Sequence, residues 1–185
     1  MIKQIAYTHG RFQPVHYGHF DVFTYILKHY DTLWIGIANP LRELPKDLDK
    51  LDPKLKESIL KARAPENNPY TYIEREEMIR AALENVNVDM RRIRVLPHFS
   101  FYDFESWRDF MPPKGDSVIV LPAKDTHHYS KLDVYKREGW EVELLPQIGR
   151  VSGKVFDAAW PDGNWKDLVP KGVDKILEKI LNRKL

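Results

Sequence analysis

The chain has 185 residues, of which 43% are hydrophobic and 30% are charged, and its formal net charge is +2. This balance is typical of a globular protein and does not favour a nucleic-acid-binding protein. The absence of cysteine excludes disulfides, thiolate nucleophiles and cysteine-bound zinc. No stretch approaches the ~20 apolar residues of a membrane span, and the first residues lack the apolar core of a signal peptide. We therefore expect one soluble, cytoplasmic domain over residues 1–185 that binds neither nucleic acid nor a membrane.

The first predicted elements alternate between strand and helix. A short apolar run at residues 2–7 predicts a strand, and apolar residues at helical spacing predict a helix at 17–30. A second strand, nearly all apolar and so buried on both faces, is predicted at 32–38. Residues 41–65 are polar, charged and proline-bearing, and they are interpreted as an insertion that carries a short helix.

The same alternation continues after the insertion. A helix is predicted at 71–86, and its apolar side is expected to hold Ile73, Met78, Ile79, Ala82 and Leu83. Strands at 92–98, 117–123 and 140–146 then alternate with helices at 104–111 and 127–139, and the last helix is predicted to start at Pro170. This order predicts an α/β fold with a doubly wound, parallel, five-stranded sheet. Ligands of such sheets bind outside the carboxyl ends of the strands, near the point where the strand order reverses.

The stretch GRFQPVHYGHF lies between the first strand and the first helix, where this fold class binds ligands. It combines two glycines, an arginine and two histidines: Gly10, Gly18, Arg11, His16 and His19. A helix N-terminus favours anions, and a glycine lets the backbone approach a phosphate closely. Imidazoles three residues apart share one side of the helix start, and each can donate to a phosphate oxygen. We interpret this stretch as a phosphate-binding loop. An exposed histidine pair or a partial metal site are the alternatives.

The same stretch closely resembles the H-x-G-H signature of nucleotidyltransferases. Its G-R-F-Q-P-x-H-x-G-H form is that of the archaeal-type nicotinamide mononucleotide (NMN) adenylyltransferases and their bacterial relatives. Weaker resemblances follow in NPYTYIEREEMI, SVIVLPAKDTHHYSKL and VSGKVFDAAWPDGNWKDLVP, so that nearly the whole chain apart from the insertion is covered. The resemblance implies a Rossmann-like fold of the nucleotidyltransferase type.

The implied reaction moves a nucleotidyl group from a nucleoside triphosphate to a phosphate-bearing acceptor and releases pyrophosphate. ATP and NMN, which would give NAD, are the first expectation. A cytidylyltransferase or other nucleotidyltransferase acting on a small phosphate or phosphonate is the alternative, and a catalytically inactive nucleotide-binding protein is the third. Mg²⁺ is expected to neutralise the pyrophosphate, held by phosphate oxygens and water rather than by a protein metal site. The chain could also form a homo-oligomer.

The resemblance assigns roles to residues of this chain. His16, His19 and Arg11 are expected to be catalytic. Contacts to the nucleotide are expected from Gly10, Phe12, Gly18, Lys124, Asp125, Ser152, Gly153 and Lys154. On the acceptor side, the expected residues are Asn39, Asp103 and Trp107, of which Trp107 would stack on the nicotinamide ring. Core packing is the alternative for Trp107, and a turn with Pro40 is the alternative for Asn39.

Two departures from the family pattern remove expected cationic contacts. The closing motif usually reads S-x-T-x-x-R, but here Lys154 stands for the threonine and Asp157 for the arginine. Asn67 stands where the family often has an arginine before its N-P motif. We expect Lys154 to replace one contact and to pair with Asp157 when the site is empty. Basic residues of the insertion could replace the other as a lid, or could simply form a solvated helix face; they are Lys54, Lys56, Lys61 and Arg63.

Overall fold

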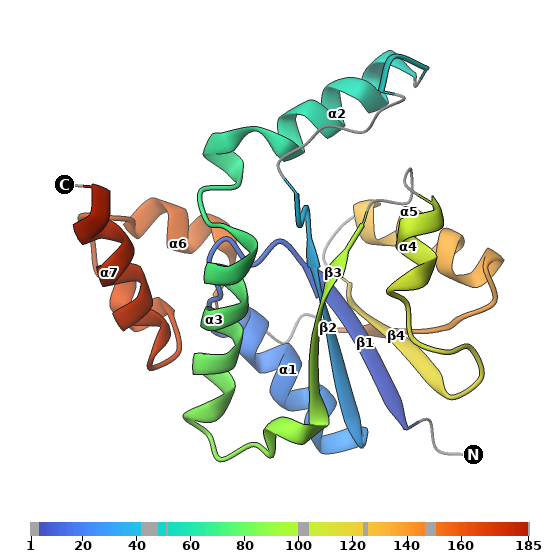
Figure 1. The fold of residues 1–185 in the computed structure, drawn as a ribbon, viewed down its shortest axis with the longest axis horizontal. Helices are drawn as coiled ribbons and strands as arrows, with labels where there is room; N and C mark the ends of the chain where they lie inside the picture. The colour runs from blue at the N-terminus through green and yellow to red at the C-terminus, as the bar shows by residue number, and fades with distance from the viewer. Residues whose placement is uncertain are drawn as a thin grey trace.

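The computed structural model describes residues 4–41, 48–50, 52–99, 104–123, 126–146 and 151–184. Its centre is a parallel sheet in which five strands follow the order β3-β2-β1-β4-β5 (Figure 1). The strands are β1 (Ile5–Gly10), β2 (Thr32–Ala38), β3 (Ile93–His98), β4 (Ser117–Pro122) and β5 (Glu141–Leu145). The chain moves outward from β1 through β2 to β3 and then crosses back to β4, so the strand order reverses between β1 and β4. The predicted doubly wound α/β fold is confirmed.

Helices cover both faces of this sheet. They are α1 (Tyr17–His29), α2 (Pro53–Arg63), α3 (Tyr72–Glu84), α4 (Phe104–Asp109), α5 (Thr126–Arg137), α6 (Gly153–Ala159) and α7 (Val173–Lys184). Figure 1 shows α1, α3, α6 and α7 on one side of the sheet and α4 and α5 on the other, while α2 projects beyond the carboxyl edge. None of the helices in these described ranges is long and apolar enough to cross a bilayer.

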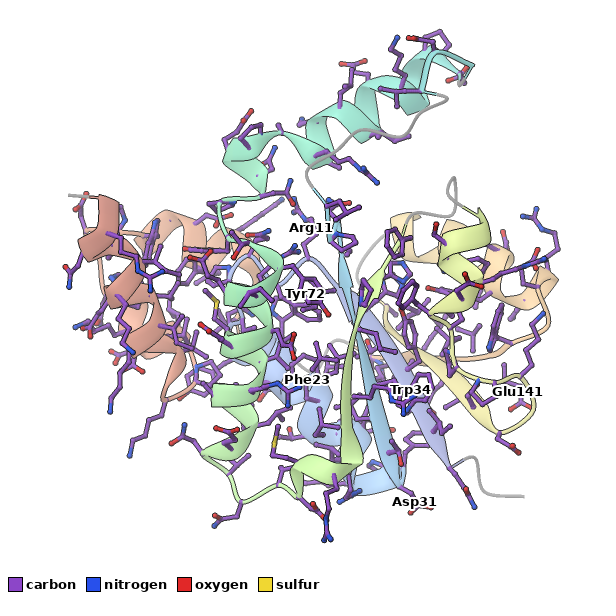
Figure 2. All side chains as sticks on the ribbon, in the orientation of Figure 1. Arg11, Phe23, Asp31, Trp34, Tyr72 and Glu141 are labelled. Carbon is purple, nitrogen blue, oxygen red and sulfur yellow. The ribbon has the colours of Figure 1, made fainter. Side chains whose placement is uncertain are left out.

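The core consists of one hydrophobic cluster on each face of the sheet. Neighbouring residues of β1 point to opposite faces. Ala6 belongs to the cluster with α1, α3 and α7, where Phe23 lies between α1 and the sheet (Figure 2). Tyr7 belongs to the cluster with α4 and α5, which includes Trp107 and Tyr135. Coverage of both faces explains why the central strands are almost continuously apolar.

The structure corrects three details of the sequence prediction. β1 runs on to Gly10, because its parallel ladder with β2 pairs Gly10 with Ile37. Ile73 is 61% exposed rather than buried, and Arg75 lies on the buried side of α3 instead. The last helix does not start at Pro170 but at Val173, after Gly172 adopts a φ of +96°. The short helix predicted in the insertion is α2.

Candidate functional site

The loop between β1 and α1 lies at the carboxyl edge of the sheet, beside the reversal of strand order. Figure 2 shows Arg11 at the end of the sheet nearest α2 and Asp31 at the opposite end. Arg11 is exposed, whereas Phe12 has a φ of 52° and is only 2% exposed. The Phe12 ring packs on Phe23 and meets the edge of His19. Phe12 therefore anchors the loop in the core, and its backbone is the part that can face a ligand.

The two predicted catalytic histidines form the capping box of α1. His16 is the N-cap residue, and its Nδ1 accepts from the backbone N–H of Gly18 at 3.1 Å. Nδ1 of His19 accepts in turn from the backbone N–H of His16 at 3.4 Å. Capping boxes usually combine Ser or Thr with Glu or Gln, so here two imidazoles perform the same task. Their rings stack with centroids 3.8 Å apart.

This capping arrangement fixes the chemistry of both imidazoles. A nitrogen that accepts a hydrogen bond carries no proton, so the proton of each neutral ring resides on Nε2. Nε2–H is therefore the donor that each histidine can offer to an oxygen. Both rings are anchored through Nδ1 to the first turn of α1, where a helix N-terminus favours an anion.

Gly18 brings the closing segment of the chain against the first turn of α1. A β-carbon built at Gly18 would stand 2.0 Å from the carbonyl oxygen of Val151. The expected reason for Gly18 was the close approach of a phosphate, but the structure shows the close approach of this backbone. Ser152 follows as the N-cap residue of α6, and exposed Lys154 lies in its first turn. Two segments that the sequence predicts to share one site are thus in contact.

Tyr70 links the phosphate-binding loop to the start of α3. The Gln13 side chain donates to the carbonyl oxygen of Tyr70 at 3.3 Å and accepts from its N–H at 3.0 Å. Burial raises the pKa of the Tyr70 hydroxyl, and the carboxylates of Asp157 and Glu74 raise it further. The charge of Asp157 therefore reaches this segment.

The ion pair expected between Asp157 and Lys154 is not formed between these two described, exposed side chains. Asp157 is therefore a local source of negative charge beside the predicted phosphate site. Lys154, in the first turn of the same helix, does not neutralise it through a direct contact.

Arg75 is the residue of this region that sequence reasoning missed. It is 2% exposed, and its guanidinium donates to the backbone carbonyls of Arg11, Ala38, Asn39 and Thr71. The signal was present in the sequence, because Arg75 continues the spacing of the buried Met78, Ile79 and Ala82 along α3. An arginine on an apolar stripe indicates a buried guanidinium with specific partners.

Asn39 and Asn67 both hold the end of the insertion. Asn39 follows β2 with a φ of 51°, and its Nδ2 donates to the Ala62 carbonyl at 3.1 Å and to Oδ1 of Asn68 at 3.4 Å. Nδ2 of Asn67 donates to the carbonyl of Lys61 at 2.8 Å.

Asn39 also lines a pocket of about 540 Å³ between the end of β2, the end of α2 and the start of α3. Oδ1 of Asn39 is the atom that could accept from a ligand.

The basic residues of the insertion divide between a solvated face and the pocket. Lys56 pairs with Asp49 within the insertion, and Lys61 is exposed. Arg63 lines the pocket beside Asn39. The side chain of Lys54 lies outside the described part of the structure. Of the four candidate lid residues, Arg63 is thus placed on a wall of the pocket.

Trp107 lies in the hydrophobic cluster under α4 and α5. It is 1% exposed, and its ring lies 5.9 Å from that of Tyr135 and 5.5 Å from that of Trp140, measured between centroids. This environment matches the alternative of core packing. Stacking on an acceptor would require the ring to become accessible, and that role stays a prediction. Asp103, Lys124 and Asp125 lie outside the described residues.

Two further histidines, His9 of β1 and His98 of β3, lie beside this cluster. His98 shares a hydrogen bond of 2.7 Å with the Tyr7 hydroxyl and stacks on His9 with centroids 4.0 Å apart. Gly36 of β2 makes room for this bridge from β1 to β3, since a β-carbon there would stand 2.1 Å from the Tyr7 hydroxyl. Burial raises the pKa of Tyr7, so its hydroxyl remains protonated.

Comparison with known proteins places the chain in one sequence family. The model of the family described as cytidylyltransferase-like matches residues 7–137. A nicotinamide-nucleotide adenylyltransferase of Saccharolobus solfataricus is 28% identical over 174 residues, which cover 92% of this chain and 88% of that protein. A phosphonoformate cytidylyltransferase of Streptomyces viridochromogenes is 29% identical over 186 residues, which cover 96% of this chain and 94% of that protein.

A solved structure shares the fold. It is a bifunctional NMN adenylyltransferase/ADP-ribose pyrophosphatase of Francisella tularensis, complexed with AMP and a manganese ion. The TM-score is 0.69 at 17% sequence identity over 97% of this chain. The chain spans about half the length of that bifunctional protein, 49% of it.

Proposed function

Because the chain belongs to the cytidylyltransferase-like family and is a nucleotidyltransferase, we propose that it joins ATP and NMN to give NAD and pyrophosphate. The observation that supports the proposal is the histidine capping box of α1, because this helix starts beside the reversal of strand order. The similarity to an archaeal nicotinamide-nucleotide adenylyltransferase over 92% of the chain supports the choice of substrates.

In the proposed reaction, a phosphate oxygen of NMN attacks the α-phosphorus of ATP and the bond from that phosphorus to the pyrophosphate oxygen breaks. The acceptor phosphate is already ionised at neutral pH, so the protein needs no general base. In the transition state, negative charge is spread over the outer oxygens of the transferred group and develops on the leaving pyrophosphate. His16 and His19 donate from Nε2 to phosphate oxygens, and the Arg11 guanidinium adds a fixed positive charge. These three residues are the proposed catalytic residues.

The remaining contacts follow from the loops at the same edge. The backbone of Gly10 and Phe12 would cradle the triphosphate, and the start of α6 would add Ser152, Gly153 and Lys154. Gly18 would contribute by holding His16 and the segment before α6 in place. Lys124 and Asp125 are proposed for the nucleotide from the motif alone. Asn39 and Asp103 are proposed for the acceptor, and the family motif alone adds Trp107, whose ring is buried in the core.

Mg²⁺ is the proposed metal ion, and its bound form would neutralise charge on the leaving pyrophosphate. Within residues 4–41, 48–50, 52–99, 104–123, 126–146 and 151–184, no group of three or more His, Asp or Glu side chains could hold an ion. We propose that the ion is bound through phosphate oxygens and water.

A second candidate is cytidylyl transfer to a small phosphonate or phosphate. The relative from Streptomyces viridochromogenes, which is similar over 96% of this chain, favours it. A binding protein without catalysis is a third candidate, but it would have little need for two anchored imidazole donors.

A nucleotide panel with detection of released pyrophosphate separates these functions. We expect turnover with ATP and NMN in the presence of Mg²⁺. Turnover with CTP and phosphonoformate, but not with ATP and NMN, would replace the first candidate by the second. Triphosphate binding without turnover of any pair would favour the third.

A further inference from the structure

Arg75 bonds to two backbone segments of the candidate site, and its side chain is only 2% exposed. It extends from the first turns of α3 toward the carboxyl ends of β1 and β2. Nη1 donates to the carbonyl oxygen of Arg11 at 3.0 Å and to that of Ala38 at 2.6 Å. Nη2 donates to the carbonyl oxygen of Asn39 at 2.9 Å. One guanidinium thus joins the phosphate-binding loop to the end of β2.

The two backbones that Arg75 joins carry residues from opposite sides of the proposed reaction. Arg11 is proposed for the triphosphate and Asn39 for the acceptor. We propose that Arg75 is a positioning residue, which holds the Arg11 and Asn39 backbones at a fixed separation so that donor and acceptor meet in line. This proposal rests on the proposed function.

The geometry explains why an arginine is needed. A guanidinium presents five N–H donors in a rigid plane, so it can serve several carbonyls on separate elements at once. Lysine carries the same charge on a single nitrogen and lacks this planar fork. Nε of Arg75 also donates to the Thr71 carbonyl at 3.2 Å, which ties the fork to its own helix. The substitution Arg75→Lys therefore preserves the positive charge and removes the fixed geometry of the guanidinium donors.

The backbone conformation of Asn39 shows why the separation between the Arg11 and Asn39 backbones needs support. Its φ of 51° lies in the left-handed region, which residues other than glycine rarely adopt. The carbonyl of Asn39 is held by Arg75, and its side-chain amide is held by Ala62 and Asn68. Without Arg75, the start of the segment after β2 would lose the contact that links it to Arg11.

Arg92 provides a matched control within the same chain. Its guanidinium donates to the carbonyls of Leu27, Tyr30 and Asp31 at 2.7–2.8 Å. The bonding chemistry is therefore that of Arg75. Asp31 lies at the end of the sheet opposite Arg11 (Figure 2), so Arg92 bridges backbone segments far from the candidate site.

The test compares Arg75→Lys with Arg92→Lys in the full chain. Pyrophosphate release gives kcat and both KM values, and thermal unfolding gives Tm. We expect Arg75→Lys to melt cooperatively and to lose ~10–10²-fold in kcat, as expected for misplaced reactants. Arg92→Lys should lower Tm and leave kcat within about 2-fold. Adding millimolar guanidinium to Arg75→Ala should restore part of its kcat, and should not change that of Arg92→Ala.

Three results would overturn the proposal. Unchanged kcat and KM in Arg75→Lys would show that the fork is not needed. Equal kinetic losses in Arg75→Lys and Arg92→Lys would show a role in stability alone. If neither Arg75→Lys nor Arg75→Gln melts cooperatively, Arg75 serves folding rather than positioning.

A wild-type chain that does not turn over ATP and NMN would refute the proposed function instead. In that case the Kd of a non-hydrolysable analogue of the triphosphate that the nucleotide panel identifies replaces kcat. A Kd about 10-fold weaker in Arg75→Lys than in Arg92→Lys, a difference of about 1.4 kcal/mol, would support the proposal. Equal Kd values in the two variants would overturn it.

Discussion

Gly18 and Val151 are in direct backbone contact, because a β-carbon at Gly18 would stand 2.0 Å from the Val151 carbonyl oxygen. The first turn of α1 and the segment that leads into α6 are thereby held together. Since these two segments carry the histidine pair and Ser152–Lys154, their contact brings the proposed phosphate-binding residues of both together. A side chain of any size at position 18 must displace one of them.

Gly18→Ala is therefore expected to destabilise the chain by about 1–3 kcal/mol, the usual cost of overpacking, and to abolish most pyrophosphate release. Chemical denaturation and the kinetic assay measure the two effects. Gly153→Ala is the control, because a β-carbon at Gly153 would have no heavy atom within 4 Å. The control should retain stability, and only its stability is compared, because Gly153 belongs to the proposed phosphate-binding segment. Wild-type activity in Gly18→Ala would contradict the proposed contact.

The capping role and the phosphate role of His16 can be separated. His16→Asn keeps an N-cap side chain that can accept from the Gly18 N–H, whereas His16→Ala removes the cap at a cost of about 1 kcal/mol. We expect both variants to lose ~10²-fold in kcat, because each lacks the Nε2 donor. Only His16→Ala should show the lower stability. Retained kcat in His16→Asn would mean that His16 acts through capping alone.

His19→Ala is expected to lower kcat by ~10²-fold or more, since a lost donor to the transition state has this order of effect. The stability loss should be small, because His19 is partly exposed and its ring contacts are with His16 and Phe12. Kinetics and thermal unfolding check both expectations. Normal turnover would exclude the phosphate role, and a large drop in Tm would indicate a core histidine.

Much of the fold can be predicted from the sequence, because hydrophobic periodicity is its strongest signal. Apolar strands that alternate with periodic helices predict a sheet covered on both faces, and the order of β1 to β5 confirms this. The boundary of α7 was misplaced, because Gly172 and the Asp174 side chain that accepts from its N–H begin the helix later than Pro170 suggests. Capping contacts of this kind depend on local geometry that periodicity does not contain.

Residues of the candidate site that belong to a sequence motif can be predicted. Residues whose position depends on packing between elements cannot. Gly10–His19 and Ser152–Lys154 were expected to converge, and Gly18 and Val151 are in contact. The burial of Arg75 was missed because Ile73 was assigned to the apolar side of α3, although it is 61% exposed. A polar side chain on a buried stripe finds its partners in other elements, which sequence spacing alone does not reveal. The oligomeric state and the cellular location stay predictions.

A substitution of Trp107 tests whether α4 contributes to acceptor binding. Because its ring is 1% exposed between Tyr135 and Trp140, we expect Trp107→Phe to lower stability by about 1–3 kcal/mol. The KM values of both substrates should change by similar factors. A selective rise in acceptor KM at unchanged Tm would instead establish the stacking contact that the family motif implies.

The closing motif gives the last prediction, because its two unusual residues have opposite charges and do not pair with each other. Exposed Lys154 lies in the first turn of α6, where its flexible side chain can reach a phosphate as a point charge. Burial raises the pKa of Tyr70 and the carboxylate of Asp157 raises it further, so the negative charge of Asp157 acts on the segment that Gln13 binds. A carboxylate near this loop should weaken the binding of a triphosphate.

Lys154→Ala is therefore expected to weaken binding of a non-hydrolysable triphosphate by ~10-fold, or about 1.4 kcal/mol. Asp157→Asn should tighten binding by removing the repulsion, and Asp157→Arg should tighten it further by restoring the cation of the family pattern. Isothermal titration calorimetry measures all three values, and Lys171→Ala, in the turn before α7, controls for general loss of positive charge. Higher salt should reduce the differences between the variants, because exposed charges are screened. Normal binding by Lys154→Ala together with weaker binding by Asp157→Arg would mean that α6 does not contact the triphosphate.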